Sequence, residues 1–416
     1  MPRFEVFDVL RNAPDSSVRV ALEEMAKIDP LTFAMFYRRL RGRTLSFDVS
    51  KEIGDPGVSD NDYYGSTLSE KDRDIKGLLT RHRPFLVQPL CDQHPHKSYQ
   101  KGRQTGVTEN SITEVIQFLM AHDNTKFIYC FPRDRQLVDF STTRLNEALN
   151  ESPRMQRLFG IPNQVYTKRI GANSFLFMRS AWESNLGEGV DADGVTFDEK
   201  DRMQDQIEVA FEESLSASKW HLRRDVSTPS LPGRGVNATY EKSCQFEWQV
   251  KCLKCGLEQT VDYPDNIIQL MDVPHGTSEL PKGAYGYRCR KDRCRGHLDR
   301  LHGRWIPRYA ERNLIHGYWI PQTICPWISA TEVMQKLISY KFKQIWENYV
   351  LGRTSIGENV MLSDDDFMSI VAGHEMVHSR TPDWDRITVG VDWGHLNWVL
   401  VMGRSEEHTS ELQSQR

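Results

Sequence analysis

The chain has 416 residues, 39% of them hydrophobic and 10% aromatic, which is enough for two or three domains with their own cores. No apolar run approaches the roughly 20 residues that span a bilayer, and the N-terminus lacks the charged head and apolar run of a signal peptide, which favours a cytoplasmic location without membrane contact. The formal net charge of −4 excludes a general attraction to nucleic acid, so any contact with DNA or RNA must come from local groups of Lys and Arg.

Residues 1–64 are predicted to form a helical arm and a linker. The helical pattern SVRVALEEMAKIDPLTFAMFYRRLRGR ends in a basic cluster from Arg38 to Arg43, and a loop-like segment rich in Gly, Asp and Ser follows. The basic cluster has two interpretations. It is either an arm that contacts DNA or a partner, or the solvated end of a capping helix.

The stretch KGRQTGVT, which begins at Lys101, has the length and central glycine of a loop that binds phosphate through backbone N–H groups. Written against the pattern G-x-x-x-x-G-K-[ST], it keeps Gly106 and Thr108 but has lysine at the first position and Val107 at the seventh. Because such a loop curls around the phosphate, Lys101 or Arg103 could supply the missing charge. The alternative is a plain turn between a strand and a helix.

From about residue 100 to 230, helical and strand patterns alternate, which predicts a parallel sheet covered by helices. An amphipathic helix follows the loop, with apolar side chains at positions 112, 115, 116, 119 and 120. Short runs rich in β-branched and aromatic residues predict strands at 126–131, 174–179, 194–199 and 223–230.

Polar residues end two of these strands, at the edge where α/β sheets bind ligands. Asp198 and Glu199 close GVTFDE, about 90 residues after the loop. A magnesium-dependent NTPase needs one such carboxylate to hold the metal and its water shell and another to polarise the attacking water. About 30 residues later, VSTPS ends a strand with Ser227, Thr228 and Pro229, and the two hydroxyls suit a terminal phosphate.

Eight cysteines in a chain of this length, several of them closely paired, favour reduced thiols and a metal site over a disulfide framework. Cys252 and Cys255 form one close pair, and Cys289 and Cys294 form a second, with 33 residues between the pairs. Four such thiolates can enclose Zn2+ tetrahedrally as a structural site. The alternative is four unligated thiols.

The cysteine-bearing segment, residues 246–308, is predicted to be a zinc-ribbon-like insertion, in which His297 is an alternative for one ligand. From Arg288 to Arg304, seven Lys or Arg residues accompany the second cysteine pair. They either contact DNA phosphates or form the solvated rim of a small domain. The remaining cysteines are expected to be core or surface thiols: Cys91, Cys130, Cys244 and Cys325.

Helical periodicity returns from about 310 to 370, and ITVGVDWGHLNWVLVMG then predicts a hairpin with Asp392 at the end of its first strand. A ribonuclease-H-like nuclease begins in this way. Cleavage with two metal ions needs at least two more carboxylates from later elements, and none follows. Residues 385–403 are therefore expected to be the start of a nuclease domain that cannot cut DNA in this chain.

The tail RSEEHTSELQSQR has no hydrophobic pattern that would continue this sheet. It resembles the conceptual translation of a widely used short-read sequencing adaptor. We therefore expect residues 404–416 to be an assembly artefact and the native protein to be longer.

In order and spacing, the loop, the carboxylate pair and VSTPS resemble the large terminase subunit of tailed bacteriophages, in particular its lambda-like branch. In that branch the phosphate loop carries its basic residue at the first position, which is Lys101 here. The resemblance covers roughly residues 65–403 and includes GYWIPQTICPWISATEVMQKLISYKFKQIWENYVLG and VGVDWG. It implies an α/β fold in which residues 65–245 form the core of a P-loop NTPase domain. Residues 309–384 would complete this domain and form a linker.

The resemblance also implies the cofactors and the roles of the motif residues. Glu199 would be catalytic, and Thr108 and Asp198 would hold Mg2+. Ser227 and Thr228 would couple hydrolysis to DNA movement. ATP would contact the whole loop: Lys101, Gly102, Arg103, Gln104, Thr105, Gly106, Val107 and Thr108.

The implied partners are double-stranded DNA, a small terminase subunit and the portal protein of the procapsid, with a homo-oligomeric ring during packaging in the bacterial cytoplasm. Asp392 would be the first ligand for Mg2+ or Mn2+ in a C-terminal endonuclease that cuts concatemeric DNA.

Two other functions fit the same motifs. A nucleic-acid helicase or other translocase would share the sheet and the carboxylate pair, and strand separation would favour it. A non-catalytic, zinc-dependent nucleic-acid-binding protein would have lost hydrolysis together with its loop lysine, and ATP turnover with and without Glu199→Gln separates this function from the others.

Overall fold

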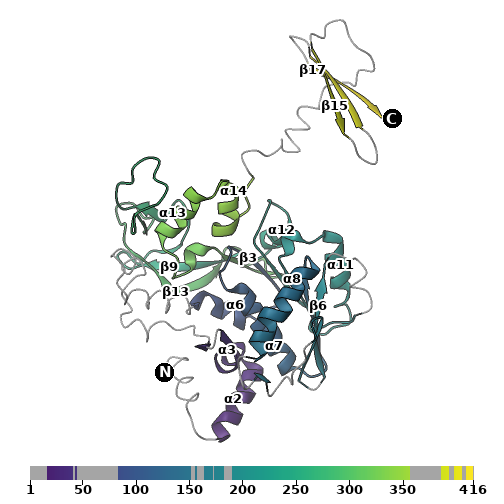
Figure 1. Ribbon diagram of the computed structural model, residues 1–416. Coiled ribbons are helices and arrows are strands. Elements are labelled where there is room, and N and C mark those ends of the chain that lie inside the picture. The colour runs from purple at the N-terminus through teal and green to yellow at the C-terminus, as the bar shows by residue number, and fades with distance from the viewer. Residues whose placement is uncertain are drawn as a thin grey trace. The chain divides into compact units, whose positions relative to one another are not determined.

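The computed structural model describes residues 16–40, 43–44, 83–150, 155–156, 164–171, 173–181, 190–356, 386–392, 398–404 and 409–415. The chain divides into two compact units, Met1–Ile356 and Gly357–Arg416 (Figure 1). Among the described helices, none combines the length and the apolar character that crossing a bilayer requires.

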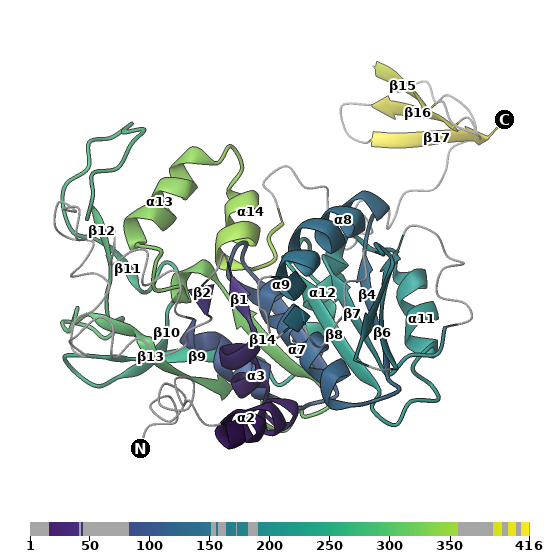
Figure 2. The same cartoon turned by 60° about the horizontal axis from the view of Figure 1, so that its bottom comes forward.

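A ten-stranded sheet runs through the first unit (Figure 1, Figure 2). It consists of β3 (His96–Lys101), β4 (Lys126–Phe131), β5 (Thr167–Ile170), β6 (Ser174–Ser180), β7 (Gly194–Asp198), β8 (Leu222–Ser227), β9 (Phe246–Cys252), β10 (Glu258–Thr260), β13 (Leu298–Pro307) and β14 (His316–Ile320). The order is β10-β9-β14-β3-β8-β7-β4-β6-β5, and β13 also pairs with β9. All pairs from β9 to β6 are parallel, whereas β5, β10 and β13 are antiparallel to their neighbours. The predicted α/β fold with a parallel sheet is confirmed.

Helices cover both faces of the sheet. They are α2 (Ser16–Ile28), α3 (Pro30–Tyr37), α6 (Val87–Cys91), α7 (Val107–Ala121), α8 (Asp134–Asp139), α9 (Asn146–Asn150), α11 (Asp205–Glu213), α12 (Gly235–Lys242), α13 (Ala330–Ser339) and α14 (Lys343–Trp346), with the 3-10 or π turns η1 (Pro84–Leu86), η2 (Phe140–Leu145), η4 (Lys200–Arg202), η5 (Gln322–Ile324) and η6 (Glu347–Leu351). Alternate residues of β4 point to opposite faces of the sheet. Phe127, Tyr129 and Phe131 pack in a core with α7. Ile128 and Cys130 pack in a core with α11. Burial on both faces explains why β4 and β7 read as nearly continuous apolar runs.

The four strands predicted between residues 126 and 230 are present as β4, β6, β7 and β8. Two of them end earlier than predicted. β7 ends at Asp198 because Glu199 adopts a left-handed conformation, with φ of 61°. β8 ends at Ser227, just before Pro229, which has no backbone N–H to donate to a ladder.

The N-terminal helices α2 and α3 pack against α7 in one core. After them, Arg38 is only 1% exposed and donates to Thr113 Oγ1 at 3.2 Å, and its guanidinium also pairs with Glu109 at 2.9 Å. Both interpretations of the basic cluster are therefore wrong for Arg38, which anchors the arm to the first turns of α7. The backbone then forms the short pair β1 (Arg39–Leu40) and β2 (Arg43–Thr44), and the other basic side chains of the cluster lie outside the described residues.

The predicted zinc-ribbon insertion is joined to the large sheet. β9 pairs with β14 in parallel and with β13 in antiparallel, while β11 (Ile267–Gln269) and β12 (Tyr285–Tyr287) form a separate pair. Trp305 and Trp248 from this segment contact one another and lie in one core with Phe85 and Tyr318. Trp305 also donates its indole N–H to the backbone oxygen of Phe85 at 2.7 Å. The insertion therefore shares both its backbone pairing and its core with the rest of the first unit.

The second unit contains a three-stranded antiparallel sheet of β15 (Arg386–Asp392), β16 (Trp398–Arg404) and β17 (Thr409–Gln415). The predicted hairpin is confirmed as β15 and β16. The expectation that the tail does not continue the sheet is wrong, since β17 pairs with β16 along its whole length. Strand pairing joins backbone N–H and C=O groups and needs no apolar pattern. The adaptor interpretation of residues 404–416 stays a prediction.

Candidate active site

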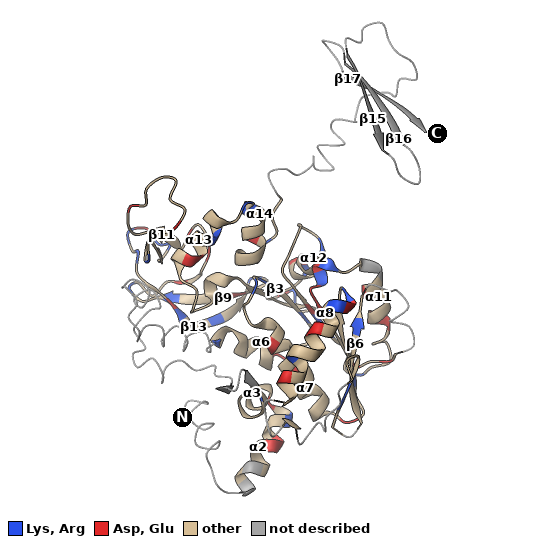
Figure 3. Ribbon diagram, in the orientation of Figure 1, with Lys and Arg blue, Asp and Glu red and all other residues tan. Residues whose placement is uncertain are grey.

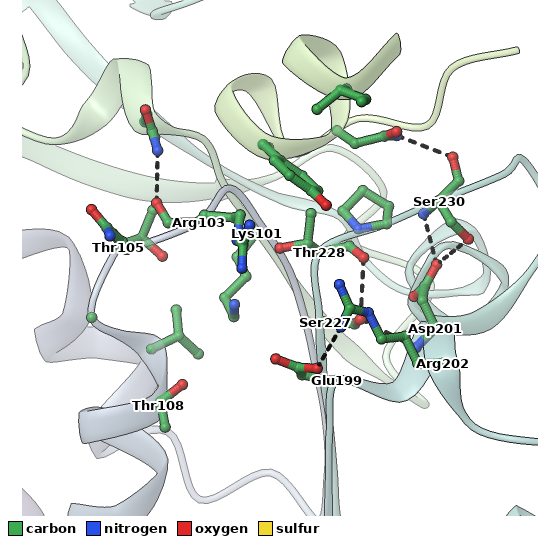
Figure 4. Close-up of a pocket in the computed structure, with 18 of the residues that line it drawn as sticks. Lys101, Arg103, Thr105, Thr108, Glu199, Asp201, Arg202, Ser227, Thr228 and Ser230 are labelled. Atoms are coloured by element: carbon green, nitrogen blue, oxygen red, sulfur yellow. Dashed lines mark hydrogen bonds and ion pairs between the residues drawn. The ribbon is translucent and has the colours of Figure 1, made fainter. Parts of the chain in front are cut away.

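A cavity of about 810 Å³ opens at the C-terminal ends of the parallel strands (Figure 4). β3, β8 and β7 are neighbours, and their register sets Gln100 beside Ser227 and Val226 beside Asp198. The segments that follow these strands therefore meet at one edge, where α/β sheets bind ligands. All residues of the predicted phosphate loop except Gly102 line the cavity, together with Glu199, Ser227 and Thr228.

The loop between β3 and α7 turns through two left-handed residues, Gln104 with φ of 60° and Gly106 with φ of 95°. Gly106 is the N-cap of α7, and its positive φ is a backbone conformation that residues with a Cβ rarely adopt. The first turn of α7 lines the cavity. Backbone N–H groups at such a helix start attract anions.

The loop carries its lysine at a position other than the usual one. Val107, which stands where such loops have lysine, is 1% exposed and belongs to the hydrophobic core. Lys101 instead lies in the cavity, between the helix that carries Thr108 and the side chain of Glu199 (Figure 4). Burial lowers the pKa of Lys101 from its ordinary value, and the carboxylates of Asp198 and Glu199 oppose that change. The arrangement supports a phosphate cation at the first loop position.

Two carboxylates with different surroundings face this cation. Asp198 is 3% exposed and accepts hydrogen bonds from Tyr129 Oη at 2.9 Å and from the backbone N–H of Glu199 at 3.0 Å. Burial raises the pKa of Asp198, and the charge of Lys101 opposes the increase. Glu199 lines the cavity and accepts from Gln136 Nε2 at 2.8 Å. Together with the Thr108 hydroxyl, these oxygens are the donors that Mg2+ prefers.

Glu199 has a strained backbone. Its φ of 61° and ψ of 40° are left-handed, a conformation that costs a residue with a Cβ roughly 1–2 kcal/mol. The turn sends the chain from β7 into η4, and Arg202 from η4 pairs with the Glu199 carboxylate at 3.3 Å. The strain is located at the residue predicted to be catalytic.

Asp201, which the sequence did not single out, fastens the segment after β8 to the segment after Glu199. Its carboxylate accepts from the backbone N–H of Ser230 at 2.7 Å, from Ser230 Oγ at 2.8 Å and from the backbone N–H of Val236 at 2.8 Å. Its own backbone N–H donates to Ser227 Oγ at 3.1 Å. No local pattern could have indicated this, because the partners lie 26–35 residues away.

A buried charge network lies behind the same strand ends. Asp225 is fully buried and contacts Lys200 at 3.0 Å, Arg223 at 3.1 Å and His96 at 3.1 Å. Burial would raise the pKa of Asp225, but the charges of Lys200 and Arg223 outweigh it and hold that pKa well below its ordinary value. Lys200 also pairs with Glu208 of α11. The network thus fixes η4, which follows Glu199, to β8 and α11.

The C-terminal part of the first unit closes the cavity and touches the loop. The backbone N–H of Arg103 donates to the Tyr349 oxygen at 2.7 Å, and the Arg103 guanidinium lies 4.5 Å from the centre of the Tyr349 ring. A Cβ on Gly102 would lie 2.9 Å from the Val350 oxygen, which explains this glycine although it does not line the cavity. In the sequence, only the resemblance to large terminase subunits indicated this segment. Cavity-lining residues that the sequence did not indicate include Arg144, Gln322, Lys336, Tyr340 and Tyr349.

The four predicted metal-binding cysteines come together. Their Sγ atoms all lie within 4.8 Å of one another, with 3.7 Å between Cys252 and Cys294 and 3.7 Å between Cys255 and Cys289. Gln259 Nε2 lies 3.2 Å from the Cys289 sulfur, an approach that suits a thiolate ligand. The remaining candidate, His297, lies outside this group, and its Nδ1 contacts Arg288 at 2.6 Å.

Asp392 is the last residue of β15 and pairs across the ladder with Trp398. Its side chain lies outside the described residues, so its role at a nuclease metal stays a prediction.

We expect Asp225→Asn to lower the free energy of unfolding by about 3 kcal/mol at pH 7, because it removes the fully buried carboxylate that pairs with both Lys200 and Arg223. Since folding lowers the pKa of Asp225, its stabilisation is complete above the ordinary carboxyl pKa and is lost as pH falls toward the lowered value. Urea unfolding at pH 7 and at pH 3 should therefore show a smaller difference between variant and wild type at pH 3. Asp191→Asn, which removes an exposed ion pair with Lys126, is the control and should change stability little. Equal effects of the two variants would contradict the assignment.

A second prediction concerns the strain at Glu199. Glu199→Gly and Glu199→Ala remove the same carboxylate and the same ion pair, but only alanine keeps a Cβ at φ of 61°. We expect the glycine variant to be more stable than the alanine variant by about 1 kcal/mol in thermal or urea unfolding, with both lacking hydrolysis. A glycine variant that is the less stable of the two would show that the left-handed turn is not strained.

Among known proteins, no curated one matches this chain. Among solved structures, the large terminase of a thermophilic bacteriophage in complex with ADP is 12% identical over 79% of this chain and 64% of that one, with a TM-score of 0.41. The large terminase ATPase domain of Thermus phage P74-26 is 15% identical over 68% and 98%, with a TM-score of 0.39, and the HK97 bacteriophage large terminase is 12% identical over 93% and 67%, with a TM-score of 0.43.

This chain thus spans less than two thirds of the length of the ADP-bound terminase. The profile of one family, described as "Phage terminase large subunit gpA, ATPase domain", matches residues 89–303, more than half of the chain. The matched range contains the phosphate loop, the carboxylate pair, the segment after β8 and all four clustered cysteines. The chain therefore belongs to the phage terminase large subunit family, through its gpA-type ATPase domain.

Proposed function

We propose that this chain is the ATPase part of a motor that drives double-stranded DNA into a phage procapsid. One observation carries the proposal: a cation, hydroxyl groups and the carboxylate of Glu199, from three separate motifs, line a single cavity at the carboxyl edge of the sheet. Membership in the terminase large subunit family supports ATP as the nucleotide.

Each motif residue has a part in hydrolysis. The loop N–H groups and the first turn of α7 hold the phosphates, and Lys101 neutralises their charge. Thr108 and Asp198 would hold Mg2+, which would offset the charge that develops on the phosphate oxygens. Glu199, oriented by Gln136, polarises the attacking water.

The coupling role of Ser227 and Thr228 is supported by what holds their segment. Ser227 Oγ accepts from the backbone of Asp201, two residues after Glu199, and donates to the Thr228 oxygen at 3.1 Å. Two residues further on, the oxygen of Ser230 accepts from Asn348 Nδ2 at 3.0 Å. A change at Glu199 on loss of phosphate can therefore reach the segment after β8 and, through Asn348, η6.

Wider parts of the function rest on the sequence motifs. We propose a place in the lambda-like branch, a longer native chain, and a C-terminal endonuclease in which Asp392 binds Mg2+ or Mn2+. The working assembly would be a homo-oligomeric ring with a small terminase subunit and the portal protein, in the host cytoplasm. The proposed division of the chain is an N-terminal arm and linker over 1–64, an ATPase core over 65–245, an insertion over 246–308, and a segment over 309–384 that completes the ATPase domain and links it to the proposed nuclease start.

We also propose that the cysteine cluster holds one structural Zn2+ ion. Four sulfur atoms within 4.8 Å of one another match the tetrahedral set that zinc prefers, and no water or substrate position is left open. The ion would fasten the end of β9 to the turn before β13.

Replacing Lys101 tests the nucleotide site. We expect Lys101→Ala to lower kcat for ATP by about 100-fold or more, since a cation that stabilises the transferring phosphoryl group is lost. Val107→Ala should retain kcat and lose about 2 kcal/mol of stability, because Val107 is a core residue. Steady-state phosphate release and thermal unfolding measure the two effects. Normal hydrolysis by Lys101→Ala, with loss in Arg103→Ala, would assign the phosphate charge to Arg103.

Metal analysis tests the cysteine site. Purified, reduced protein should contain one zinc per chain, and Cys289→Ser should lose it and unfold at a lower temperature, because metal binding stabilises such a unit. Cys91→Ser, outside the cluster, is the control and should keep the metal. Protein that folds normally and carries no zinc would falsify the proposal.

A further inference from the structure

The seven basic residues around the second cysteine pair fall into two groups. Arg288 contacts His297, Arg300 donates to buried backbone oxygens such as that of Thr323, and Arg304 pairs with Glu258. These three have structural roles. The other four are exposed and form no ion pair with any described residue: Arg290, Lys291, Arg293 and Arg295.

These four residues, with the exposed Lys254 from the first cysteine pair, are named the basic knuckle. Asp292 is the one acidic residue within residues 288–296, in a chain whose formal net charge is −4. Figure 3 shows Lys and Arg in blue along β13 and beside β11, the part of the fold to which the knuckle belongs. The sequence thus concentrates uncompensated positive charge on one small surface of a chain that is acidic as a whole.

The two turns that carry the knuckle are held close together. Lys254 Nζ donates to the Cys294 oxygen at 3.3 Å, and a Cβ on Gly296 would lie 2.7 Å from the Cys252 sulfur. Arg293 and Arg295 both have left-handed φ, 61° and 44°, on either side of Cys294. Such strain persists only where surrounding bonds impose it. Bonds from a metal to the four sulfurs would impose it here.

The chemistry of the surface selects the partner. Closely spaced exposed cations match a phosphate backbone, and duplex DNA carries one negative charge per about 1.7 Å of its axis. Neither turn contains an aromatic residue, in CLKC or in CRKDRCRG, so the surface offers no platform for stacking the bases of a single strand. The knuckle therefore fits the duplex backbone without base readout.

The knuckle is also on the side of the sheet where the cavity opens. β9 runs parallel to β14, and β14 runs parallel to β3, so Cys252 and Lys101 end their strands in the same direction. β9 pairs with β14 only through Phe246 and Glu247 and continues to Cys252. DNA on the knuckle would thus lie toward the carboxyl edge at which ATP is proposed to bind.

We propose that the basic knuckle docks on the phosphate backbone of duplex DNA, and that the metal-bound cysteines hold it in the docking shape. The inference rests on the proposed function for its partner, DNA, and adds the surface and the mode of binding. Base sequence plays no part in this interaction.

The test uses the full chain with its metal. In one variant Arg290, Lys291, Arg293 and Arg295 are changed to Ala, and in a matched control four exposed cations elsewhere are changed to Ala: Lys219, Lys282, Arg312 and Lys341. Binding to a duplex of about 30 base pairs, long enough to cover several turns of the helix, is measured by fluorescence anisotropy at several salt concentrations, beside a single strand of equal length. ATP hydrolysis without DNA is measured for every protein.

The knuckle variant should bind the duplex at least about tenfold more weakly and show a shallower salt dependence, because the slope of log K against log salt falls by about 0.9 for each phosphate that the protein no longer neutralises. The control should bind like wild type, and all three should hydrolyse ATP equally. Removing the metal with a chelator should weaken duplex binding by the wild type and change the knuckle variant little.

Three outcomes would overturn the inference: equal weakening by the two sets of substitutions, wild-type binding by the knuckle variant, or stronger binding of the single strand than of the duplex. Each of these leaves the proposed function standing if ATP is hydrolysed. Loss of hydrolysis in the wild type would instead contradict the proposed function.

Discussion

The parallel alignment of β3, β8 and β7 is the constraint on which the candidate site depends. Parallel strands bring their carboxyl ends to one edge, so groups more than about 100 residues apart in the chain meet around one cavity. Because β8 lies between the other two, Ser227 ends a strand that neighbours both the strand of Lys101 and the strand that leads to Glu199.

The backbones of the loop and of the C-terminal segment of the first unit pack closely against each other. A Cβ on Gly102 would meet the Val350 oxygen, and a Cβ on Gly352 would lie 2.7 Å from the Gly102 nitrogen. Gln100 Nε2 adds a hydrogen bond to the Gly352 oxygen at 2.9 Å. Glycine at both positions lets the two backbones lie in contact, so the loop packs directly against the segment from Tyr349 to Gly352.

The sheet also joins the cysteine cluster to the phosphate loop. β14 pairs with β3 on one side and with β9 on the other, and the aromatic core beneath them includes Trp248 and Tyr318. Closely packed protein interiors transmit strain. A single strand, β14, therefore separates β9 from β3, and the cysteine cluster follows where β9 runs on beyond its pairing with β14.

Local patterns determined part of this protein. The order of apolar runs set β4, β6, β7 and β8, and the spacing of glycine, lysine and threonine set the loop and α7. The short intervals within the two cysteine pairs predicted the four cysteines whose sulfur atoms lie together in the structure. In each case the information lies within about ten residues, the range over which backbone geometry alone relates side chains.

Tertiary structure decided the rest, because those features join residues that no sequence interval relates. Arg38 belongs to a cluster predicted either to contact DNA or a partner or to be solvated, and it is instead buried and hydrogen-bonded to α7. Asp201 contacts Ser230 because the segment after β8 lies beside η4. Tyr349 contacts Arg103 because η6 lies beside the loop. The division of one basic run into structural and exposed residues depended on where Glu258 and the buried carbonyl groups lay. Residue types and short spacings specified the chemistry available, and only the pairing of distant strands, with the burial that followed, determined which groups meet.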